Sequence, residues 1–284
     1  MISSFFKEHL EDQLGDSILS GSPLVGGDIN SVLLLNTEGG KKVIKINKKK
    51  DFPGLFEKEK EGLEALDASI TIRVPKAFKT GNYKEFTYLI LEYIESKEKR
   101  IDFWESFGQK LSLMHQKSNE KFGFKNSNYI GSLPQKNQWC DTAVEFYISQ
   151  RLMPQFKLAG SKGYYFKNIE LFYKRIEGVI PVEPPALIHG DLWNGNYIID
   201  ETGDVCLIDP SVAFFHREMD IAMMHLFRGF DQRLFDSYQS ISPLEKEWEK
   251  RMDIWQLYYL IVHLNLFGSS YLNSVDQIIK KYTS

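Results

Sequence analysis

The chain has 284 residues, of which 43% are hydrophobic and 14% are aromatic. This composition can fill a large buried core, so the sequence predicts a globular protein of one large domain or two lobes. The formal net charge of -3 predicts no general attraction to nucleic acid or to anionic lipid. The two cysteines, Cys140 and Cys206, lie far apart without metal-ligand spacing. This pattern argues against a disulfide framework or a zinc site and is typical of a reducing cytoplasm.

The most apolar parts of the sequence predict neither a signal peptide nor a membrane span. Residues 1–15 contain acidic side chains and no long apolar core. The most apolar window, 257–267, is far shorter than the roughly 20 residues that a membrane-spanning helix needs. We therefore expect a cytoplasmic protein without a membrane or nucleic-acid partner; the sequence leaves the oligomeric state open, and a monomer is favoured.

Residues 1–91 predict a small lobe that is rich in strands. It begins with a short amphipathic helix over 2–15, with Phe5, Phe6, Leu10 and Leu14 on one side. Apolar runs separated by glycines then predict a five-stranded lobe with one main helix. The expected strands are the two arms of 24–35, which flank Gly26 and Gly27, and the runs 43–46, 74–77 and 86–92; the main helix is 55–66, and a turn is expected at 80–82.

Two features of this lobe indicate a phosphate-binding site. The pair Gly26 and Gly27 lets backbone N–H groups approach phosphate oxygens, although most such pairs are ordinary hairpin turns. Lys45 lies within an apolar strand, where a lysine is costly unless an anion accompanies it. Glu59 shares the apolar face of the next helix and is the expected partner. The alternative is a solvated Glu59 and an edge-strand Lys45 that extends to water.

After residue 91 the sequence predicts a short linker and then a mainly helical region. Residues 92–96 are expected to form a linker in which the backbone of Glu92 and Ile94 can hydrogen-bond adenine, or simply the end of a strand. From residue 97 to 284 the apolar spacing is mainly helical, apart from central hairpins. The polar loop 122–137 could face a polar substrate or merely anchor itself.

The central hairpin region carries the residues that we expect to do the chemistry. A buried strand at 186–188 leads into a polar loop with Asp191 and Asn196, and Asp209 follows the hairpin 197–208. Phosphoryl transfer needs a base to orient the attacking hydroxyl and oxygen ligands for Mg²⁺. Asp191 is suited to the first task, and Asn196 and Asp209 to the second. The simpler alternative is a loop whose Asp191 and Asn196 only make turn hydrogen bonds.

Neighbouring residues are expected to support this loop. His189, Asp191 and Asn196 match the H-x-D-x-x-x-x-N spacing of protein-kinase catalytic loops. Asp220 is expected to brace the loop through backbone N–H groups, or else to cap its own helix. His115 follows an apolar helical stripe and is expected to be a packing residue.

Six stretches make the chain similar to the fructosamine kinase (ketosamine 3-kinase) family, which belongs with aminoglycoside phosphotransferases and choline kinases. The motifs FGF...NYIG, HGDLWNGN and HREMD together are specific to this family. The matching stretches are FEKEKEGL (56–63), FGFKNSNYIGSLPQKN (122–137), RLMPQ (151–155), HGDLWNGN (189–196), DPSVAFFHREMDIAM (209–223) and VHLNLFG (262–268).

The resemblance implies an α+β, two-lobed, protein-kinase-like fold with a small β-rich lobe and a larger helical lobe. It also implies ATP-dependent phosphorylation of the sugar 3-hydroxyl of ketosamines, with Mg²⁺, on proteins or free amines, which leads to deglycation. By the same resemblance Asp191 is the base, Asn196 and Asp209 are the metal ligands, Lys45 and Glu59 are the nucleotide pair, and Trp193 stacks on the sugar or its amine.

Two departures from the family pattern and two rival functions are open at this point. Phe215 stands where the family usually has glycine, which predicts a tighter cleft wall, and the Gly26–Gly27 loop lacks the cysteine of some relatives. One rival is another small-molecule kinase, because fold does not select the acceptor. The other is a non-catalytic kinase-like binding protein, which should lack at least one residue of the set Lys45, Asp191, Asn196 and Asp209; all four are present.

Overall fold

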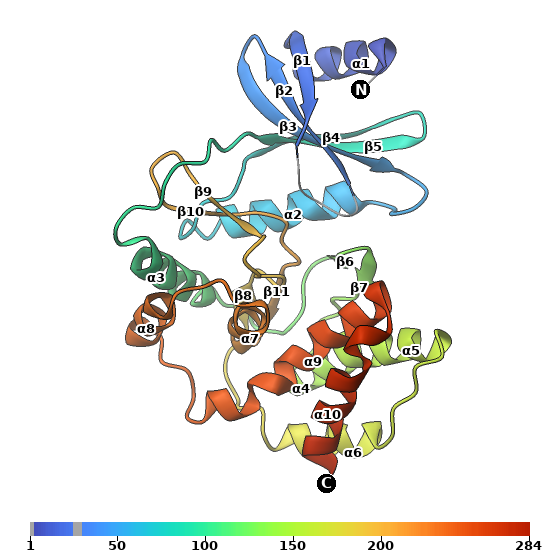
Figure 1. Cartoon of the computed structure of the whole chain (residues 1–284), viewed down its shortest axis with the longest axis vertical. Coiled ribbons are helices and arrows are strands. Elements are labelled where there is room, and N and C mark those ends of the chain that lie inside the picture. Colours follow the sequence, from blue (N-terminus) through green and yellow to red (C-terminus); the bar gives the residue numbers. More distant parts are fainter. Residues whose placement is uncertain (1–2, 25–29) are drawn as a thin grey trace.

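A computed structural model describes residues 3–24 and 30–284, which form two stacked parts (Figure 1). The upper part contains an antiparallel sheet in the order β1-β2-β3-β5-β4, with α1 and α2 packed against it. Its elements are α1 (Ser4–Leu14), β1 (Ile18–Pro23), β2 (Ser31–Thr37), β3 (Gly40–Lys48), α2 (Leu55–Asp67), β4 (Ala77–Tyr83) and β5 (Phe86–Glu92).

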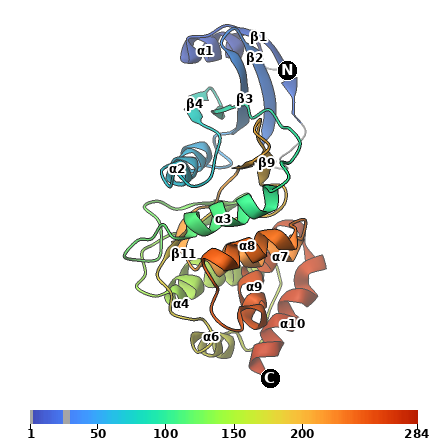
Figure 2. The same ribbon diagram turned by 90° about the vertical axis from the view of Figure 1, so that its left-hand side faces the viewer.

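The lower part is mainly helical and holds three short strand pairs, β6–β7, β8–β11 and β9–β10. Helices α3 and α8 lie side by side beneath the β9–β10 hairpin (Figure 2). The helical elements are α3 (Phe103–His115), α4 (Ala143–Phe146), the π-helix η1 (Tyr147–Leu152), α5 (Met153–Ser161), α6 (Ile169–Glu177), α7 (Glu218–Phe227), α8 (Gln232–Ile241), α9 (Trp248–Phe267), the 3₁₀-helix η2 (Ser269–Tyr271) and α10 (Leu272–Thr283). The strands are β6 (Asn128–Ile130), β7 (Leu133–Gln135), β8 (Ala186–Ile188), β9 (Tyr197–Ile199), β10 (Val205–Leu207) and β11 (Ala213–Phe215).

Apolar packing holds the two parts together. Phe6 and Leu10 of α1 pack with Ile44 and Tyr88 on one face of the sheet. A larger core joins α2 to α3, α8 and the β9–β10 hairpin, and a further core surrounds α9. Because one continuous core contains residues of both parts, the relative position of the parts is fixed by burial of apolar surface. Among the described residues, we find no helix with the length and apolar character that crossing a membrane requires.

The predicted strand-rich lobe is present, but some predicted boundaries are wrong. The segment 80–82, predicted as a turn, lies inside β4, and the chain turns instead near Lys84, whose φ is 52°. Gly81 pairs with Tyr88, and a Cβ at Gly81 would lie 2.3 Å from the Tyr88 hydroxyl oxygen. This glycine therefore permits a close side-chain approach within a strand, as glycines in strands often do.

Three other expectations for residues 1–91 fail. Strand β1 ends at Pro23, before the predicted arm at 24, and β4 begins only at Ala77 instead of at residue 74. Phe5 is 68% exposed, whereas Phe6 is 5% exposed. The apolar face of α1 therefore passes through Phe6 and Leu10 and leaves Phe5 in solvent.

Candidate active site

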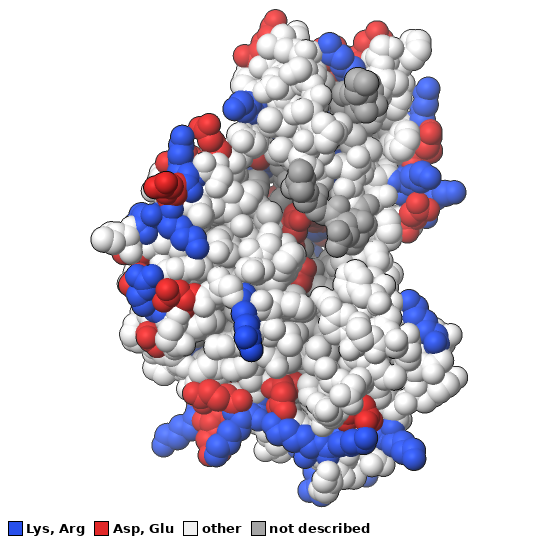
Figure 3. Space-filling model, in the orientation of Figure 1, with Lys and Arg blue, Asp and Glu red and all other residues white. Residues whose placement is uncertain are grey.

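The polar loop 189–196 follows strand β8 and lies at the hollow between the two parts of the molecule. Figure 3 shows this hollow, with acidic side chains exposed inside it. Within the loop, Asn196 Nδ2 donates to the carbonyl of Asp191 (2.8 Å) and to its Oδ2 (3.1 Å). These bonds fix the Asp191 carboxylate and leave Oδ1 of the Asn196 amide as the atom that can serve a metal ion. The structure thus brings together two of the three predicted polar groups.

The environment of Asp191 makes it a stronger base than an ordinary aspartate. Enclosure by protein raises the pKa of Asp191 to about 7, and the nearby charge of Asp209 acts in the same direction. The hydrogen bond from Asn196 opposes this rise, and the charge of Asp220 adds to it. A base with a pKa near neutrality is suited to accept a proton from a sugar hydroxyl at physiological pH.

Asp220 braces this loop as the sequence predicted. It is fully buried at the start of α7, and its two carboxylate oxygens accept from the backbone N–H groups of His189 (2.7 Å) and Gly190 (2.8 Å). His115, expected only to pack, also lies 3.2 Å from Oδ2 of Asp220 through Nε2. Gly190 has a φ of 82°, and a Cβ there would lie 2.2 Å from the carbonyl of Ser211, so only glycine fits.

His189 ties the loop to the hairpin. Its Nε2 donates to the carbonyl of Ile208 (2.9 Å), and its Nδ1 accepts from the N–H of Asp191 (3.3 Å). Burial lowers the pKa of His189, which keeps the ring neutral and compatible with both bonds. The supporting positions predicted for His189 and Asp220 are therefore observed in the structure.

Replacing Asp220 by asparagine should destabilise the catalytic loop. The new amide NH₂ would face a backbone donor. We therefore expect the free energy of unfolding to fall by about 1–3 kcal/mol, and kcat to fall as well. Thermal unfolding and steady-state kinetics measure both effects. The matched control is Asp253→Asn, because Asp253 only pairs with Lys281 and Tyr282 at the C-terminal end. Equal stability of the two variants would contradict the bracing role.

Lys45 of β3 joins the lobes through two carboxylates. Its Nζ lies 2.6 Å from Oε1 of Glu59, on α2, and also contacts Oδ1 of Asp209. Lys45 is only 7% exposed; burial alone would lower its pKa, but the charges of Asp209 and Glu59 outweigh burial and raise it. The ammonium is therefore held charged, as a phosphate-binding group must be.

Asp209 has a left-handed backbone conformation, which is unusual for a residue other than glycine. Its φ is 55°, a left-handed value that is uncommon outside glycine and is often found at functional positions. Its side chain is 43% exposed, whereas those of Lys45 and Glu59 are 8% and 11% exposed. The Asp209 carboxylate is thus open to solvent, while the charges of Lys45 and Glu59 are enclosed by protein.

The other residues predicted to contact the nucleotide are Glu92, Ile94, Gly26 and Gly27. Glu92 ends β5 and its N–H donates to the carbonyl of Lys76 (2.9 Å). Ile94 follows in the linker with a buried side chain, 5% exposed. Gly26 and Gly27 lie outside the described residues.

Trp193 lies in the catalytic loop, two residues after Asp191. Its side chain is 39% exposed. A Cβ at Gly195 would lie 2.3 Å from the Trp193 ring, so the indole rests directly on the loop backbone. The absence of a side chain at Gly195 leaves room for the ring there, and the exposed ring surface is of the kind that can stack on a sugar or an amine.

Sequence reasoning missed a set of contacts that hold α2 in place. Asn126 Nδ2 donates to both carboxylate oxygens of Glu61 (2.9 and 3.0 Å), and the Tyr129 hydroxyl donates to the carbonyl of Pro53 (3.0 Å). Both residues come from the segment 122–137. Of the two roles left open for this segment, these contacts match the anchoring one, because they hold the helix that carries Glu59.

The close packing of α2 against the chain after Asp209 predicts a sensitive position. A Cβ at Gly62 would lie 3.2 Å from Pro210 and 3.4 Å from Val212. A valine there should displace α2, and with it Glu59, and lower kcat by about 100-fold, since displacements near 1 Å have effects of that size. Steady-state kinetics on folded protein measures this.

Gly160→Val is the matched control. Gly160 lies in the last turn of α5, where a Cβ would lie 3.9 Å from the Tyr165 ring, an ordinary contact distance. Both variants place a β-branched residue in a helix, in the middle of α2 and in the last turn of α5. Wild-type kcat in a folded Gly62→Val variant would contradict the role given to α2.

Phe215 does not narrow the cleft. It is fully buried and packs against Phe146, with ring centroids 4.9 Å apart, and against Trp255 at 5.6 Å. The expectation of a tighter cleft wall at this position is therefore wrong. The larger side chain fills the core of the helical part instead.

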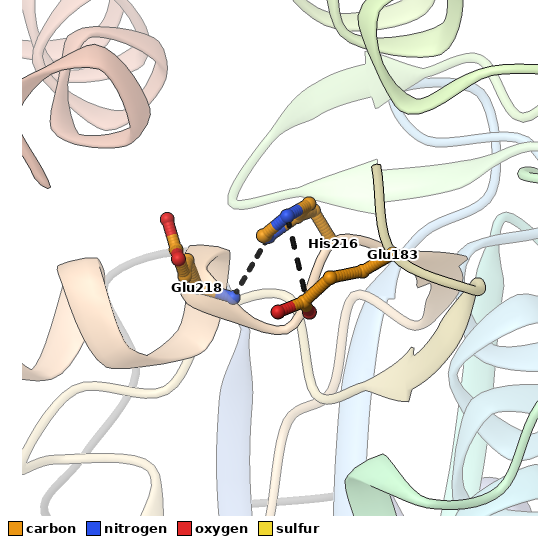
Figure 4. Close-up of side chains that lie close together, drawn as sticks. All are labelled: Glu183, His216 and Glu218. Atoms are coloured by element: carbon orange, nitrogen blue, oxygen red, sulfur yellow. Dashed lines mark hydrogen bonds and ion pairs between the residues drawn. The ribbon is translucent and has the colours of Figure 1, made fainter. Parts of the chain in front are cut away.

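Within the described part of the chain, one group of histidine and acidic side chains is close enough to hold a metal ion (Figure 4). It consists of Glu183, His216 and Glu218. His216 Nδ1 accepts from the N–H of Glu218 (3.3 Å), so in the neutral ring Nε2 carries the proton and cannot ligate a metal. Burial lowers the pKa of His216 and favours that neutral form. Arg217 Nε donates to Glu183 (2.7 Å) and Arg251 Nε donates to Glu218 (2.9 Å), which makes the cluster a structural ion-pair network.

Comparisons with known proteins agree with this geometry. The fructosamine kinase family model matches residues 2–284. A probable ketoamine kinase of Enterococcus faecium is 39% identical over 284 residues, covering 96% of this chain and 99% of the relative. The chloroplastic protein-ribulosamine 3-kinase of Arabidopsis thaliana is 37% identical, covering 90% of this chain and 80% of the relative.

Solved structures show the same fold. A Haemophilus somnus protein provisionally assigned as a fructosamine-3-kinase has a TM-score of 0.89 at 26% identity, covering 98% of this chain and 97% of the other. An aminoglycoside phosphotransferase solved with ADP and hygromycin B has a TM-score of 0.64 at 14% identity, covering 98% and 99%. This likeness confirms the α+β, protein-kinase-like fold. The chain belongs to the fructosamine kinase family.

Proposed function

We propose that this protein is an Mg²⁺- and ATP-dependent kinase that phosphorylates the sugar 3-hydroxyl of ketosamines, on proteins or on free amines, and so acts in deglycation. The observation that carries the proposal is a set of contacts: Asn196 donates to Asp191, Lys45 pairs with Asp209, and the charge of Asp209 acts on Asp191. A complete set of roles in the right geometry is the accepted confirmation of a kinase motif. The names of the ketoamine and ribulosamine kinases among its relatives support the choice of acceptor.

The transfer step is an in-line displacement at the γ-phosphorus. The sugar oxygen forms a bond to phosphorus while the bond from phosphorus to the bridging oxygen of ADP breaks. Asp191 orients the hydroxyl and accepts its proton, and its raised pKa favours that acceptance. Lys45, fixed by Glu59, contributes a positive charge for the phosphates.

The chain offers suitable ligands for one magnesium ion. Asp209 has an exposed carboxylate and Asn196 has an amide oxygen that its hydrogen bonds leave available, and hard oxygen donors are the ligands that Mg²⁺ prefers. These two residues would hold the ion, which neutralises charge on the phosphates. The Gly26–Gly27 segment would contact the phosphates through its backbone, and the backbone of Glu92 and Ile94 would bind adenine.

The same proposal divides the chain into functional parts. Residues 1–91 form the nucleotide lobe, 92–96 the hinge, and 97–284 the lobe that holds the acceptor. Trp193 offers its exposed ring to the sugar or its amine. We further propose that the protein works as a monomer in the cytoplasm, on small or protein-bound ketosamines, without a nucleic-acid or membrane partner.

A substrate panel tests this function. Purified protein is incubated with ATP and Mg²⁺ and with a fructosyl-amine, a ribulosyl-amine, choline or an aminoglycoside, and ADP formation is followed. Turnover on the ketosamines alone is the expected result, and it should stop when Mg²⁺ is chelated and return when it is restored. Turnover only on choline or the aminoglycoside would keep the kinase mechanism and reject the acceptor. No turnover with ATP still bound would favour a binding protein.

A further inference from the structure

Arg73 connects the end of the sheet to the hairpin of the helical part. It lies between α2 and β4, and its guanidinium contacts three carboxylates. Nη2 donates to Oε1 of Glu92 (2.8 Å), and Nη1 donates to Oδ2 of Asp200 (3.1 Å) and to Oε1 of Glu201 (2.6 Å). Glu92 is the last residue of β5, whereas the other two acids lie at the tip of the β9–β10 hairpin. One side chain therefore spans the boundary between the two parts.

The backbone of Arg73 reinforces the same connection. Its carbonyl accepts from the N–H of Leu207 (2.8 Å), and Arg73 forms a parallel bridge with Cys206 of β10. The hairpin is thus added to the edge of the upper part, beside α2 (Figure 1). The two residues that flank this hairpin, Asn196 and Asp209, are the proposed metal ligands.

The opposite side of the hairpin is fixed to the lower part. Asp204 accepts from Arg100 Nη1 (3.1 Å) and from Lys110, which lies on α3. Gly203 has a φ of 80°, and a Cβ there would lie 2.9 Å from the carbonyl of Glu98. With this side fixed, Arg73 supplies the charged link between the hairpin and the sheet.

Arg73 also immobilises the residue whose backbone is the proposed adenine contact. Oε1 of Glu92 receives the guanidinium, Oε2 accepts from the N–H of Lys76 (3.1 Å), and the N–H of Glu92 donates to the Lys76 carbonyl (2.9 Å). With both carboxylate oxygens and the N–H engaged, the Glu92 peptide has a defined orientation. The side chains of Arg73 and Glu92 are 29% and 33% exposed, so this pair contributes little to global stability and acts mainly through geometry.

We propose that Arg73 is a positioning residue for the nucleotide. It holds the end of β5, where adenine would bind, at a fixed distance from the hairpin that lies between the proposed metal ligands. Both ends of one ATP molecule can then be bound at the same time. The inference rests on the proposed function, because it takes ATP to occupy the hollow. It goes beyond that function in assigning nucleotide affinity to a side chain that touches neither adenine nor phosphate.

Arg73→Ala tests this assignment through a split between the two substrates. We expect the KM for ATP to rise about 10-fold, while the KM for a fructosyl-amine at saturating ATP stays within about 2-fold. A tenfold change corresponds to about 1.4 kcal/mol of binding free energy. Arg73→Lys retains the charge but not the forked geometry, so its KM for ATP should lie between that of the wild-type protein and that of Arg73→Ala. A purely structural role would change both KM values or only the thermal unfolding temperature.

Glu92→Gln provides the second variant, since it keeps the side-chain shape and removes the charge that Arg73 binds; its amide NH₂ also replaces one of the two oxygens that accept from Arg73 and from the Lys76 N–H. It should raise the KM for ATP in the same direction, and the double variant with Arg73→Ala should show less than the sum of the two effects. If Arg73→Ala does not fold, the Glu92→Gln result decides alone.

Arg233→Ala is the matched control. Arg233 also pairs with two carboxylates, Asp231 and Glu105, but within the helical part. It should leave both KM values unchanged. An unaltered KM for ATP in folded Arg73→Ala and in Glu92→Gln would overturn the inference. Wild-type protein that does not bind MgADP in calorimetry would instead overturn the proposed function.

Discussion

Replacing Asp191 by asparagine should lower kcat by about 10²- to 10⁴-fold, the range typical of a lost general base. Asparagine has nearly the same shape, so the bonds from Asn196 can re-form in part, but an amide cannot accept the hydroxyl proton. The affinity for MgADP should stay within about 3-fold, because the role proposed for Asp191 is toward the acceptor hydroxyl and not toward the nucleotide. Single-turnover kinetics at saturating ATP and ketosamine, with calorimetry of MgADP binding, measures the two quantities separately.

Asp236→Asn is the control for this change. Asp236 lies on α8 and accepts from Gln232 at an exposed position, so its replacement should leave kcat unchanged. If Asp191→Asn retained more than about a tenth of wild-type kcat, Asp191 would not be the base.

Lys45→Met should lower kcat/KM for ATP by about 10²- to 10³-fold, the size of effect seen when one group that stabilises transition-state charge is removed. Methionine fills a similar volume in β3 but leaves Glu59 and Asp209 without the cation between them. We therefore also expect a lower unfolding temperature, because a buried carboxylate without its partner is costly. Steady-state kinetics and thermal unfolding test both effects.

The double variant Lys45→Met, Glu59→Gln separates stability from catalysis. Removing the second buried charge should recover part of the unfolding temperature and none of the activity. Lys42→Met is the control, since Lys42 lies on the same strand but pairs with Asp16 (3.0 Å), which is not one of the proposed site residues. Activity restored together with stability in the double variant would mean that Lys45 has only a structural role.

The sequence predicted those parts of the site whose geometry is set locally. Asp191 and Asn196 are close together in the chain, and a loop between two strands brings them into contact. The sequence also predicted the Lys45–Glu59 ion pair, because a charged residue on an apolar strand and another on the apolar face of a helix each need a partner.

The features that the sequence did not predict depend on contacts that the local sequence does not show. The turn predicted at Gly81 fails within one hairpin, because a glycine in the sequence does not distinguish a turn from a strand position on which a facing ring, here that of Tyr88, packs closely. Arg73 and Tyr129 have no motif that marks them, and their partners Asp200 and Pro53 lie far away in the chain.

The central claim, that this cleft transfers the γ-phosphate of ATP to the 3-hydroxyl of a ketosamine, is tested most directly by ³¹P NMR of a fructosyl-amine incubated with the protein, ATP and Mg²⁺. The account predicts a new phosphomonoester signal coupled to the proton on C3, formed in equal amount to ADP and absent with the Asp191→Asn variant. A phosphate on another carbon, or the same signal from the Asp191→Asn variant at the wild-type rate, would contradict it.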